Sequence, residues 1–243
     1  MKTCALYIVH YGVEYLGYSI KSVYDSVDKI FIFYTQHPSH GRKVSFPCPE
    51  TEGQIKEAAY QFGDPDDKIM WKKGWWSTEG QQRSAGEEMC QAMGYNVVVV
   101  SDYDEVWDKQ ALNQAIQYVK DNPFKRYRVP MIHFWKDFNT VCKDLAQPVR
   151  FVKFSGDGEG YVPLERPVWH FGYAISDEIM KYKWEIHGHF DELRPDWFEK
   201  VWLGGRMTDV HPTNLEDFWT PEHYFKEQLP EFMQLHPRYD KDK

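Results

Sequence analysis

The chain has few cysteines, no long apolar run and little clustered positive charge. Its four cysteines, in 243 residues, are widely separated. None of them forms a Cys-x-x-Cys pair, and so the sequence gives no sign of a zinc site or a thioredoxin-like motif. This cysteine content is consistent with a reducing, cytoplasmic setting. No segment approaches the roughly 18 apolar residues that a membrane-spanning helix needs. The chain also begins with a predicted strand and not with a signal peptide. Because no segment is long and apolar enough, we expect no membrane span.

Basic residues are too sparse to indicate binding to a phosphate backbone. The net charge is −8, and basic clusters such as Lys72-Lys73 and residues 125–128 are short. Nonspecific nucleic-acid binding depends on clustered Lys and Arg. The charge balance therefore disfavours a nucleic-acid partner without excluding one. Aromatic residues make up 17% of the chain, which suits sugar or base stacking and equally the filling of a core.

The most informative stretch is a run of four valines, Val97–Val100, followed by Asp102-Tyr103-Asp104-Glu105. Such a run predicts a strand buried on both faces, which is typical of a parallel sheet covered by helices. In an extended segment Asp102 and Asp104 project to the same side. Adjacent carboxylates favour a hard divalent cation, and ligands of open α/β sheets bind at the carboxyl ends of strands. The alternative is turn chemistry, with Asp capping local amides.

The flanking segments predict an α/β fold. Apolar runs at residues 3–11 and 29–34 enclose a helix with one apolar face, which is a βαβ unit with a parallel pair. A third strand is predicted at 68–71. A helix follows from Thr78 to Gly94, with a capping box at Thr78. Its predicted apolar face consists of Ala85, Met89, Ala92 and Met93.

Arg83 lies near the N-terminus of that helix, where an anion would also be favoured. The alternative is a surface arginine paired with Glu87 one turn on.

In the second half of the chain we predict a helix at 109–120 and another at 176–184. Between them we predict strands at 127–135 and 149–154, separated by an irregular segment at 136–148. The Gly-rich loop 155–160 has no Lys-Ser/Thr ending, and so it is not a phosphate-binding P-loop. Beyond Pro195 the chain is rich in Trp, Phe and Pro. We expect a mixed, mainly parallel sheet flanked by helices in residues 1–192, and a helical or irregular aromatic-rich extension, 193–243, packed on it.

The order of these elements resembles the nucleotide-sugar-dependent glycosyltransferases of the GT-A (Rossmann-like) fold. Their common pattern has an Arg-bearing helix before a strand that ends in Asp-Ala-Asp-Glu, which matches Arg83 and residues 102–105. Two later segments, Trp169-His-Phe-Gly-Tyr173 and His187-Gly-His189-Phe-Asp191, are similar to motifs of the β-1,4-mannosyl-glycoprotein N-acetylglucosaminyltransferase family. The resemblance covers roughly residues 3–192.

The resemblance implies a metal-dependent glycosyltransferase that moves a hexosyl- or N-acetylhexosaminyl-type sugar from a nucleotide-diphosphate sugar, most simply a UDP-sugar, to a hydroxyl of a glycan, a small molecule or another acceptor. It implies Mn²⁺ or Mg²⁺ held by Asp102, Asp104 and His187, with His170 and His189 as competitors for the histidine position.

Further residues follow from the same resemblance. Arg83 would contact the diphosphate. The base and ribose would lie near His10, Tyr11 and Glu14, and Tyr103 would contact the donor or point into the core.

An inverting reaction needs a carboxylate base, for which Asp157, Glu159, Glu165 and Asp191 are the candidates. Trp135, Trp169 and Tyr173 would form an acceptor platform or belong to the core.

Two other functions stay open. A nucleotidyltransferase acting on a sugar phosphate also combines an α/β sheet with acidic metal ligands. It usually needs a Gly-rich or basic loop after the first strand, which Gly12 alone does not supply. The other alternative is a noncatalytic carbohydrate-binding protein.

Overall fold

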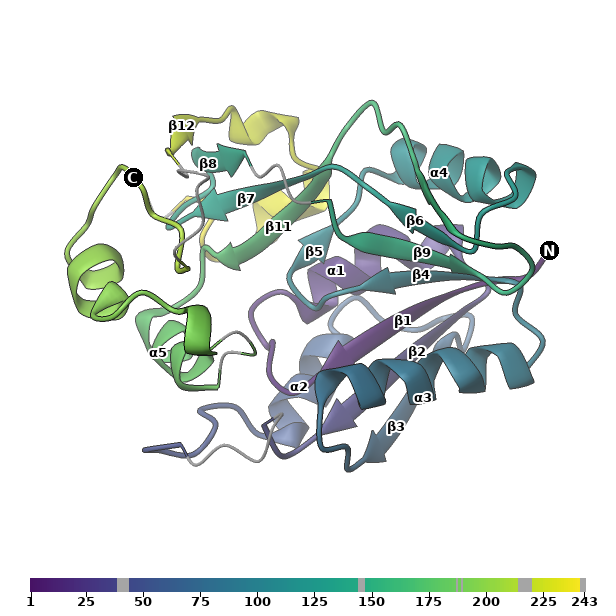
Figure 1. The fold of residues 1–243 in the computed structure, drawn as a ribbon, viewed down its shortest axis with the longest axis horizontal. Helices are drawn as coiled ribbons and strands as arrows, with labels where there is room; N and C mark the ends of the chain where they lie inside the picture. Colours follow the sequence, from purple (N-terminus) through teal and green to yellow (C-terminus); the bar gives the residue numbers. More distant parts are fainter. Residues whose placement is uncertain (39–43, 144–146, 187, 189, 214–219, 241–243) are drawn as a thin grey trace.

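Two β-sheets and the helices around them form the body of the protein (Figure 1). The computed structural model describes residues 1–38, 44–143, 147–186, 188, 190–213 and 220–240. In the larger sheet the strands run in the order β10-β6-β9-β4-β1-β2-β3. These strands are β1 (Thr3–Val9), β2 (Lys29–Thr35), β3 (Ile69–Gly74), β4 (Val97–Ser101), β6 (Arg126–Arg128), β9 (Val149–Lys153) and β10 (Glu159–Tyr161).

Most pairs in this sheet are parallel. β3, β2, β1 and β4 run in one direction, β10 is parallel to β6, and β9 is antiparallel to both β4 and β6. The predicted fold class, a mixed and mainly parallel sheet flanked by helices, is therefore confirmed.

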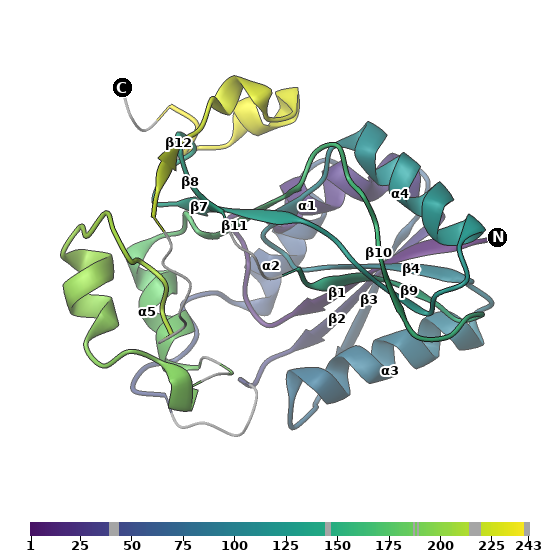
Figure 2. The ribbon, with the colours of Figure 1, turned by 45° about the horizontal axis from the view of Figure 1, so that its top comes forward.

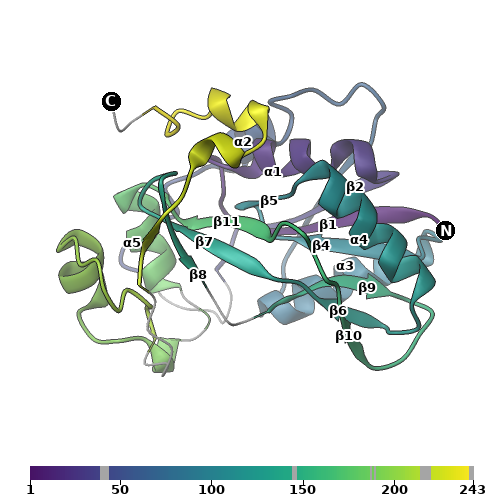
Figure 3. The ribbon, with the colours of Figure 1, turned by 90° about the horizontal axis from the view of Figure 1, so that it is seen from above.

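Helices cover both faces of this sheet, as Figures 2 and 3 show. On one face lie α1 (Leu16–Val23), continued by η1 (Tyr24–Ser26), together with α2 (Glu52–Ala59) and α4 (Lys109–Asp121), and on the other lies α3 (Glu79–Ala92). A hydrophobic core lies on each face of the sheet, and alternate residues of β1 contribute to each. Ala5 and Tyr7 pack on the α1 side, and Cys4 and Leu6 pack on the α3 side. This alternation is the two-residue period of a strand buried on both faces.

The second sheet begins where β4 ends. Its strand order is β12-β8-β7-β11-β5. Residues 102–104 form a turn closed by a hydrogen bond from the Glu105 N–H to the Asp102 carbonyl (3.2 Å), and β5 then pairs with β11. The strands are β5 (Glu105–Val106), β7 (Met131–Trp135), β8 (Thr140–Lys143), β11 (Val168–Tyr173) and β12 (Glu222–His223). The acidic stretch is therefore the junction of the two sheets.

Two expectations about this half are wrong. The single strand predicted at 127–135 is two strands, β6 and β7, which belong to different sheets and are separated by Pro130. Proline lacks the N–H that a continuous ladder needs, which accounts for the break. The segment 136–148, expected to be irregular, contains β8.

The C-terminal part packs on this body. It comprises α5 (Asp177–Glu185), the short helices η3 (Phe190–Glu192), η5 (Lys226–Gln228) and η6 (Glu231–Leu235), and a π-helix, η4 (Phe198–Leu203). The ring of His236 stacks on Tyr15, and Arg238 pairs with Glu14 at 2.7 Å. Among the residues that the structure describes, no helix is long and apolar enough to cross a bilayer.

Candidate functional site

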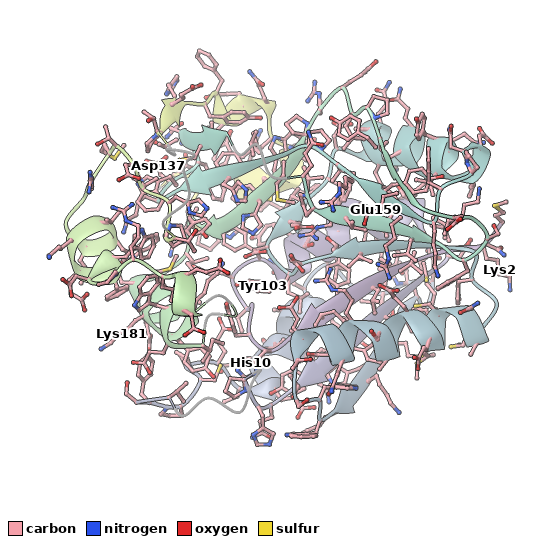
Figure 4. All side chains as sticks on the ribbon, in the orientation of Figure 1. Lys2, His10, Tyr103, Asp137, Glu159 and Lys181 are labelled. Carbon is pink, nitrogen blue, oxygen red and sulfur yellow. The ribbon has the colours of Figure 1, made fainter. Side chains whose placement is uncertain are left out.

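A cleft of about 310 Å³ lies at the carboxyl ends of β1, β2 and β4. Its walls include His10, Tyr11, Gln82, Asp102–Asp104, His170 and Lys183. Figure 4 shows His10 and Tyr103 near the centre of the molecule, between the sheet and α5. The volume suits a small-molecule ligand, and the position is where open α/β sheets bind ligands.

Asp102 is neutralised by two arginines. Its Oδ2 accepts a hydrogen bond from Arg150 Nη2 at 2.6 Å, and its Oδ1 lies 3.7 Å from Arg83 Nη2. Burial acts to raise the pKa of Asp102, but the charges of Arg150 and Arg83 outweigh it, and so the pKa lies below its ordinary value. The expectation of an extended Asp-x-Asp segment is wrong, because the chain turns at these residues to enter the second sheet.

Arg150 also holds Glu105, which is fully buried, through its Nε and Nη2 groups. Burial alone would lower the pKa of Arg150, but Asp102 and Glu105 raise it, and so the guanidinium stays charged. Burial raises the pKa of Glu105 to about 8 against the opposing charge of Arg150, and so near neutral pH the guanidinium mainly balances the charge of Asp102.

Asp104 lacks such a partner. The residue is 2% exposed, and its Oδ1 makes no hydrogen bond with the described residues. His170 Nε2 lies 3.5 Å from Oδ1, and Lys183 Nζ lies 3.8 Å from Oδ2. Burial raises the pKa of Asp104 to about 6, with Lys183 opposing the rise and Asp102 adding to it. A proton or a bound cation would therefore stabilise the buried carboxylate.

The tertiary fold brings His170 to Asp104, because β11 pairs with β5 next to the acidic turn. His170 is aligned with His133 on the neighbouring strand β7, and their Nδ1 atoms are 2.7 Å apart. Burial lowers the pKa of His170 far below its ordinary value, and His133 lowers it further, so that the ring is neutral. One proton lies between the two Nδ1 atoms. When His170 donates it, the Nε2 atom facing Asp104 carries a lone pair.

Gly172 keeps the space among these groups open. A Cβ atom at this position would lie 2.4 Å from His170 Cε1, 2.7 Å from Lys183 Nζ and 2.8 Å from Asp104 Oδ2. Any other residue would therefore displace at least one of them.

The residues present fit a divalent cation. Asp104 Oδ1, which makes no hydrogen bond with the described residues, lies 3.5 Å from His170 Nε2, and a carboxylate oxygen and an imidazole nitrogen are common metal ligands. In the described part of the chain, no three His, Cys, Asp or Glu residues converge. The remaining coordination positions would therefore come from a bound ligand and water, as is usual for ions held with substrate phosphates.

The structure places the other predicted residues as follows. His187 and His189 lie outside the described residues. His10 and Tyr11 line the cleft, where His10 Nδ1 donates to the Thr35 carbonyl and its Nε2 accepts from the Tyr182 hydroxyl. Glu14 does not line the cleft, because its carboxylate pairs with Arg238 and accepts from the Ser176 N–H.

Tyr103 lines the cleft, whereas Arg83 lies beside it, 3.7 Å from Asp102. Arg83 pairs with Glu79 at 2.8 Å, and the predicted alternative partner, Glu87, pairs with Arg126 at 3.0 Å. The Tyr103 ring lies against Gly12, where a Cβ would be 2.4 Å from the ring, and its buried hydroxyl makes no hydrogen bond with the described residues.

The predicted bases lie elsewhere. Asp157 and Glu159 follow β9, which runs antiparallel to β4, and so they lie at the end of the sheet opposite Asp104. Figure 4 shows Glu159 well apart from Tyr103. Asp191 is exposed on η3 and is not part of the cleft wall. Of the predicted acceptor platform, Trp135 and Trp169 are core residues, 1% and 2% exposed, which leaves them no surface for a sugar.

Two cleft residues, Gln82 and Lys183, and the buried Arg150 bound to Asp102 escape the sequence analysis. The predicted apolar face of α3 is right only in part: Ala85 and Met89 are half-buried and pack against the core, whereas Ala92 and Met93 are exposed. The fully buried residues of this helix are Gln82, Gly86 and Cys90. Their four-residue spacing is a signal in the sequence that they share one face of the helix. Gly86 lets the helix approach Leu6, because a Cβ atom at position 86 would lie 2.6 Å from the Leu6 side chain. Arg150 stands in an apolar strand, which signals a buried ion pair. Lys183 gives no such signal.

Comparison with known proteins gives limited similarity. No family model matches the chain, and no curated protein does. Neither result supports the resemblance of residues 169–173 and 187–191 to the β-1,4-mannosyl-glycoprotein N-acetylglucosaminyltransferase family.

Solved structures show weak similarity of fold. A protein from Desulfovibrio desulfuricans, assigned as a nucleotide-diphospho-sugar transferase, aligns with a TM-score of 0.37 at 12% identity, over 63% of this chain and 64% of that one. The 4-diphosphocytidyl-2C-methyl-D-erythritol synthase of Anaerococcus prevotii aligns with a TM-score of 0.41 at 10% identity, over 74% and 95% of the two chains. Similarity of this degree assigns neither a family nor an activity.

Proposed function

We propose that this protein is a metal-dependent glycosyltransferase that moves a sugar from a nucleotide-diphosphate sugar, specifically a UDP-sugar, to an acceptor hydroxyl. The observation that carries the proposal is the pair formed by Asp104 Oδ1 and His170 Nε2. Both residues line the cleft, the two atoms are 3.5 Å apart, and the carboxylate oxygen is buried without a hydrogen bond to the described residues. An unpaired buried acceptor is costly, and a bound cation would satisfy both atoms.

Asp104 and His170 would hold Mn²⁺ or Mg²⁺, which when bound offsets the charge that develops on the diphosphate as the glycosidic bond breaks. The nitrogen ligand favours Mn²⁺, because Mg²⁺ prefers oxygen ligands. Asp102 has a different role in this proposal. Its carboxylate is bound by Arg150, and it holds Arg83 in place at the edge of the cleft.

His133 orients the nitrogen ligand. By accepting the Nδ1 proton of His170, at 2.7 Å, it leaves the lone pair on Nε2, toward Asp104. Partners of this kind fix the tautomer of a metal-binding histidine and the direction of its ring.

Two cations would bind the diphosphate. The side chain of Arg83 is 25% exposed and that of Lys183 is 18% exposed, and both lie beside the aspartates. Hydrogen bonds between such cations and phosphate oxygens are among the strong ones in proteins. The Tyr103 hydroxyl, buried and unpaired beside them, would donate to the same ligand.

The loop after β1 separates this proposal from a nucleotidyltransferase. The backbone N–H groups of Gly12 and Val13 both donate to Glu50, at 2.5 and 3.0 Å. These are the groups that a triphosphate-binding loop would offer to its ligand, and here a carboxylate occupies them. Residues 10–14 also contain no Lys or Arg. The arrangement favours a diphosphate donor bound near Asp104.

The test is donor turnover by the purified protein. UDP-sugar hydrolysis and transfer are measured with Mn²⁺, with Mg²⁺ and with a chelator. We expect activity with either ion and none with the chelator. Asp104→Asn should lower turnover about 10³-fold, because several kcal/mol of charge stabilisation are lost.

Asp157→Asn, at the far end of the sheet, is the matched control and should keep its activity. Release of pyrophosphate from a nucleoside triphosphate in the presence of a sugar phosphate would contradict the proposal and favour a nucleotidyltransferase. Glycan binding without turnover of any donor would favour a noncatalytic protein.

A further inference from the structure

Gln82 is a buried polar residue on the β1–β2 side of the cleft. It is 3% exposed, and its Nε2 donates to the carbonyl groups of Phe33 at 2.7 Å and Val9 at 3.4 Å. Carbonyl oxygens only accept hydrogen bonds, and a flipped amide would set Oε1 against both of them. The orientation of the Gln82 amide is therefore fixed by the ends of β1 and β2.

This orientation leaves Oε1 as an unused acceptor. Gln82 lines the cleft, and within the described part of the chain its only hydrogen bonds are those two from Nε2. Among the described residues, Oε1 is not one of the fully buried atoms that lack a partner, and so it is open to the cleft. A ligand that carries an N–H or O–H group would donate to it there.

His10, on the same side of the cleft, is already engaged. His10 uses Nδ1 with the Thr35 carbonyl and Nε2 with the Tyr182 hydroxyl. Gln82 Oε1 is therefore a fixed acceptor on the β1–β2 side of the cleft, whereas Asp104 and His170 lie on the β4–β5 side. A ligand whose phosphates bind near Asp104 would extend its other end toward Gln82.

We propose that Gln82 Oε1 accepts a hydrogen bond from a ring N–H of the donor's nucleobase, the imide N3–H of uracil or the N1–H of guanine, and so selects bases that carry this group. Cytosine and adenine have a bare nitrogen at the corresponding ring position, and in the same pose its lone pair would face Oε1. This inference rests on the proposed function, because it requires a nucleotide in the cleft.

The experiment combines a change in the protein with a change in the ligand. Dissociation constants of UDP and of N3-methyl-UDP, which lacks the imide proton, are measured by calorimetry with Mn²⁺ present. The wild type should bind UDP at least about 10-fold more tightly than the methylated compound, because one buried hydrogen bond is lost. In Gln82→Met, which keeps the length of the side chain and lacks the acceptor, the two ligands should bind equally.

Both ligands are compared on the same protein, and so any loss of stability in Gln82→Met affects the two constants alike. Gln91→Met, on the exposed side of the same helix, is the matched control and should keep the wild-type preference. CDP and ADP should bind at least about 10-fold more weakly than UDP or GDP, and comparison of UDP with GDP identifies which imide base is preferred.

The outcomes separate the two proposals. Equal binding of UDP and N3-methyl-UDP by the wild type, or a preference that survives in Gln82→Met, would overturn the role of Gln82 and leave the proposed function intact. Absence of binding by every nucleotide would overturn the proposed function itself.

Discussion

The two ends of the seven-stranded sheet differ in how their charged groups are satisfied. At the carboxyl end of β4, Asp104 Oδ1 and the Tyr103 hydroxyl are buried without hydrogen-bond partners among the described residues. Toward the opposite end, Glu159 on the edge strand β10 pairs with Arg128 at 2.9 Å, with side chains 48% and 49% exposed, and Asp157 accepts from the Gly158 N–H.

This difference indicates which end of the sheet binds a ligand. Water already satisfies polar groups at an exposed end, and so their pairing adds little to stability. Buried polar groups without partners cost free energy, and such groups concentrate where a ligand completes them. Carboxylates are present at both ends of the sheet, and burial without a partner distinguishes the end that we propose to be the active one.

The largest expected effect concerns the two arginines. Arg150→Met leaves Asp102 and Glu105 without their common partner and should lower the free energy of unfolding by about 3–5 kcal/mol. Arg128→Met removes an exposed pair and should cost at most about 1 kcal/mol. Urea denaturation of both variants gives the two values, and equal losses would abolish the contrast between the ends.

The second effect is the pH dependence of stability in the metal-free protein. The pKa of Asp104 is raised from 3.8 to about 6, and so the folded state holds its proton more tightly than the unfolded state. Stability contributed by this proton is complete below pH 4 and is lost as pH rises to about 6. A gap of about two pKa units corresponds to about 3 kcal/mol.

Denaturation curves at pH 4 and pH 7 test this effect. The wild type should lose about 3 kcal/mol more than Asp104→Asn between the two values, since asparagine does not titrate. Asp157→Asn should follow the wild type. A wild type and Asp104→Asn with the same pH dependence would show that Asp104 ionises normally.

The third effect sharpens the role of the paired histidines. His133→Phe removes the acceptor for His170 Nδ1 and should weaken Mn²⁺ binding about 10–100-fold. His133→Gln retains an acceptor oxygen and should restore most of the affinity. Titration calorimetry with Mn²⁺, alongside melting temperatures, separates this effect from a loss of folding. Equal affinities in the wild type and His133→Phe would argue against the orienting role.

The smallest effect is expected at the far end of the sheet. Glu159→Gln should leave donor turnover within about twofold of the wild type, because Glu159 is remote from Asp104 and its exposed ion pair contributes little. Steady-state rates with saturating Mn²⁺ measure this. A loss of 100-fold or more would restore Glu159 as a candidate base and remove the functional difference between the two ends.

Local patterns predict much of the framework. The valine run and the apolar segments at 3–11 and 29–34 predict β4, β1 and β2, because a doubly buried strand must be apolar on both faces. Thr78 predicts the start of α3, and its side chain accepts from the Gln81 N–H as expected. The same reasoning finds only part of the packed face of α3, Ala85 and Met89. It weighs apolar residues and so overlooks Gln82, a buried glutamine that donates to strand-end carbonyls.

By itself the sequence determined the mainly parallel sheet and the acidic stretch at the end of its central strand, since both follow from the hydrophobicity of neighbouring residues. Only the tertiary structure decided which side chains meet there. His170 reaches Asp104 through the pairing of β11 with β5, Arg150 reaches Asp102 from β9, and Glu14 is diverted to Arg238. These contacts join residues far apart in the chain, and their energies depend on burial and exact position, which local periodicity does not encode.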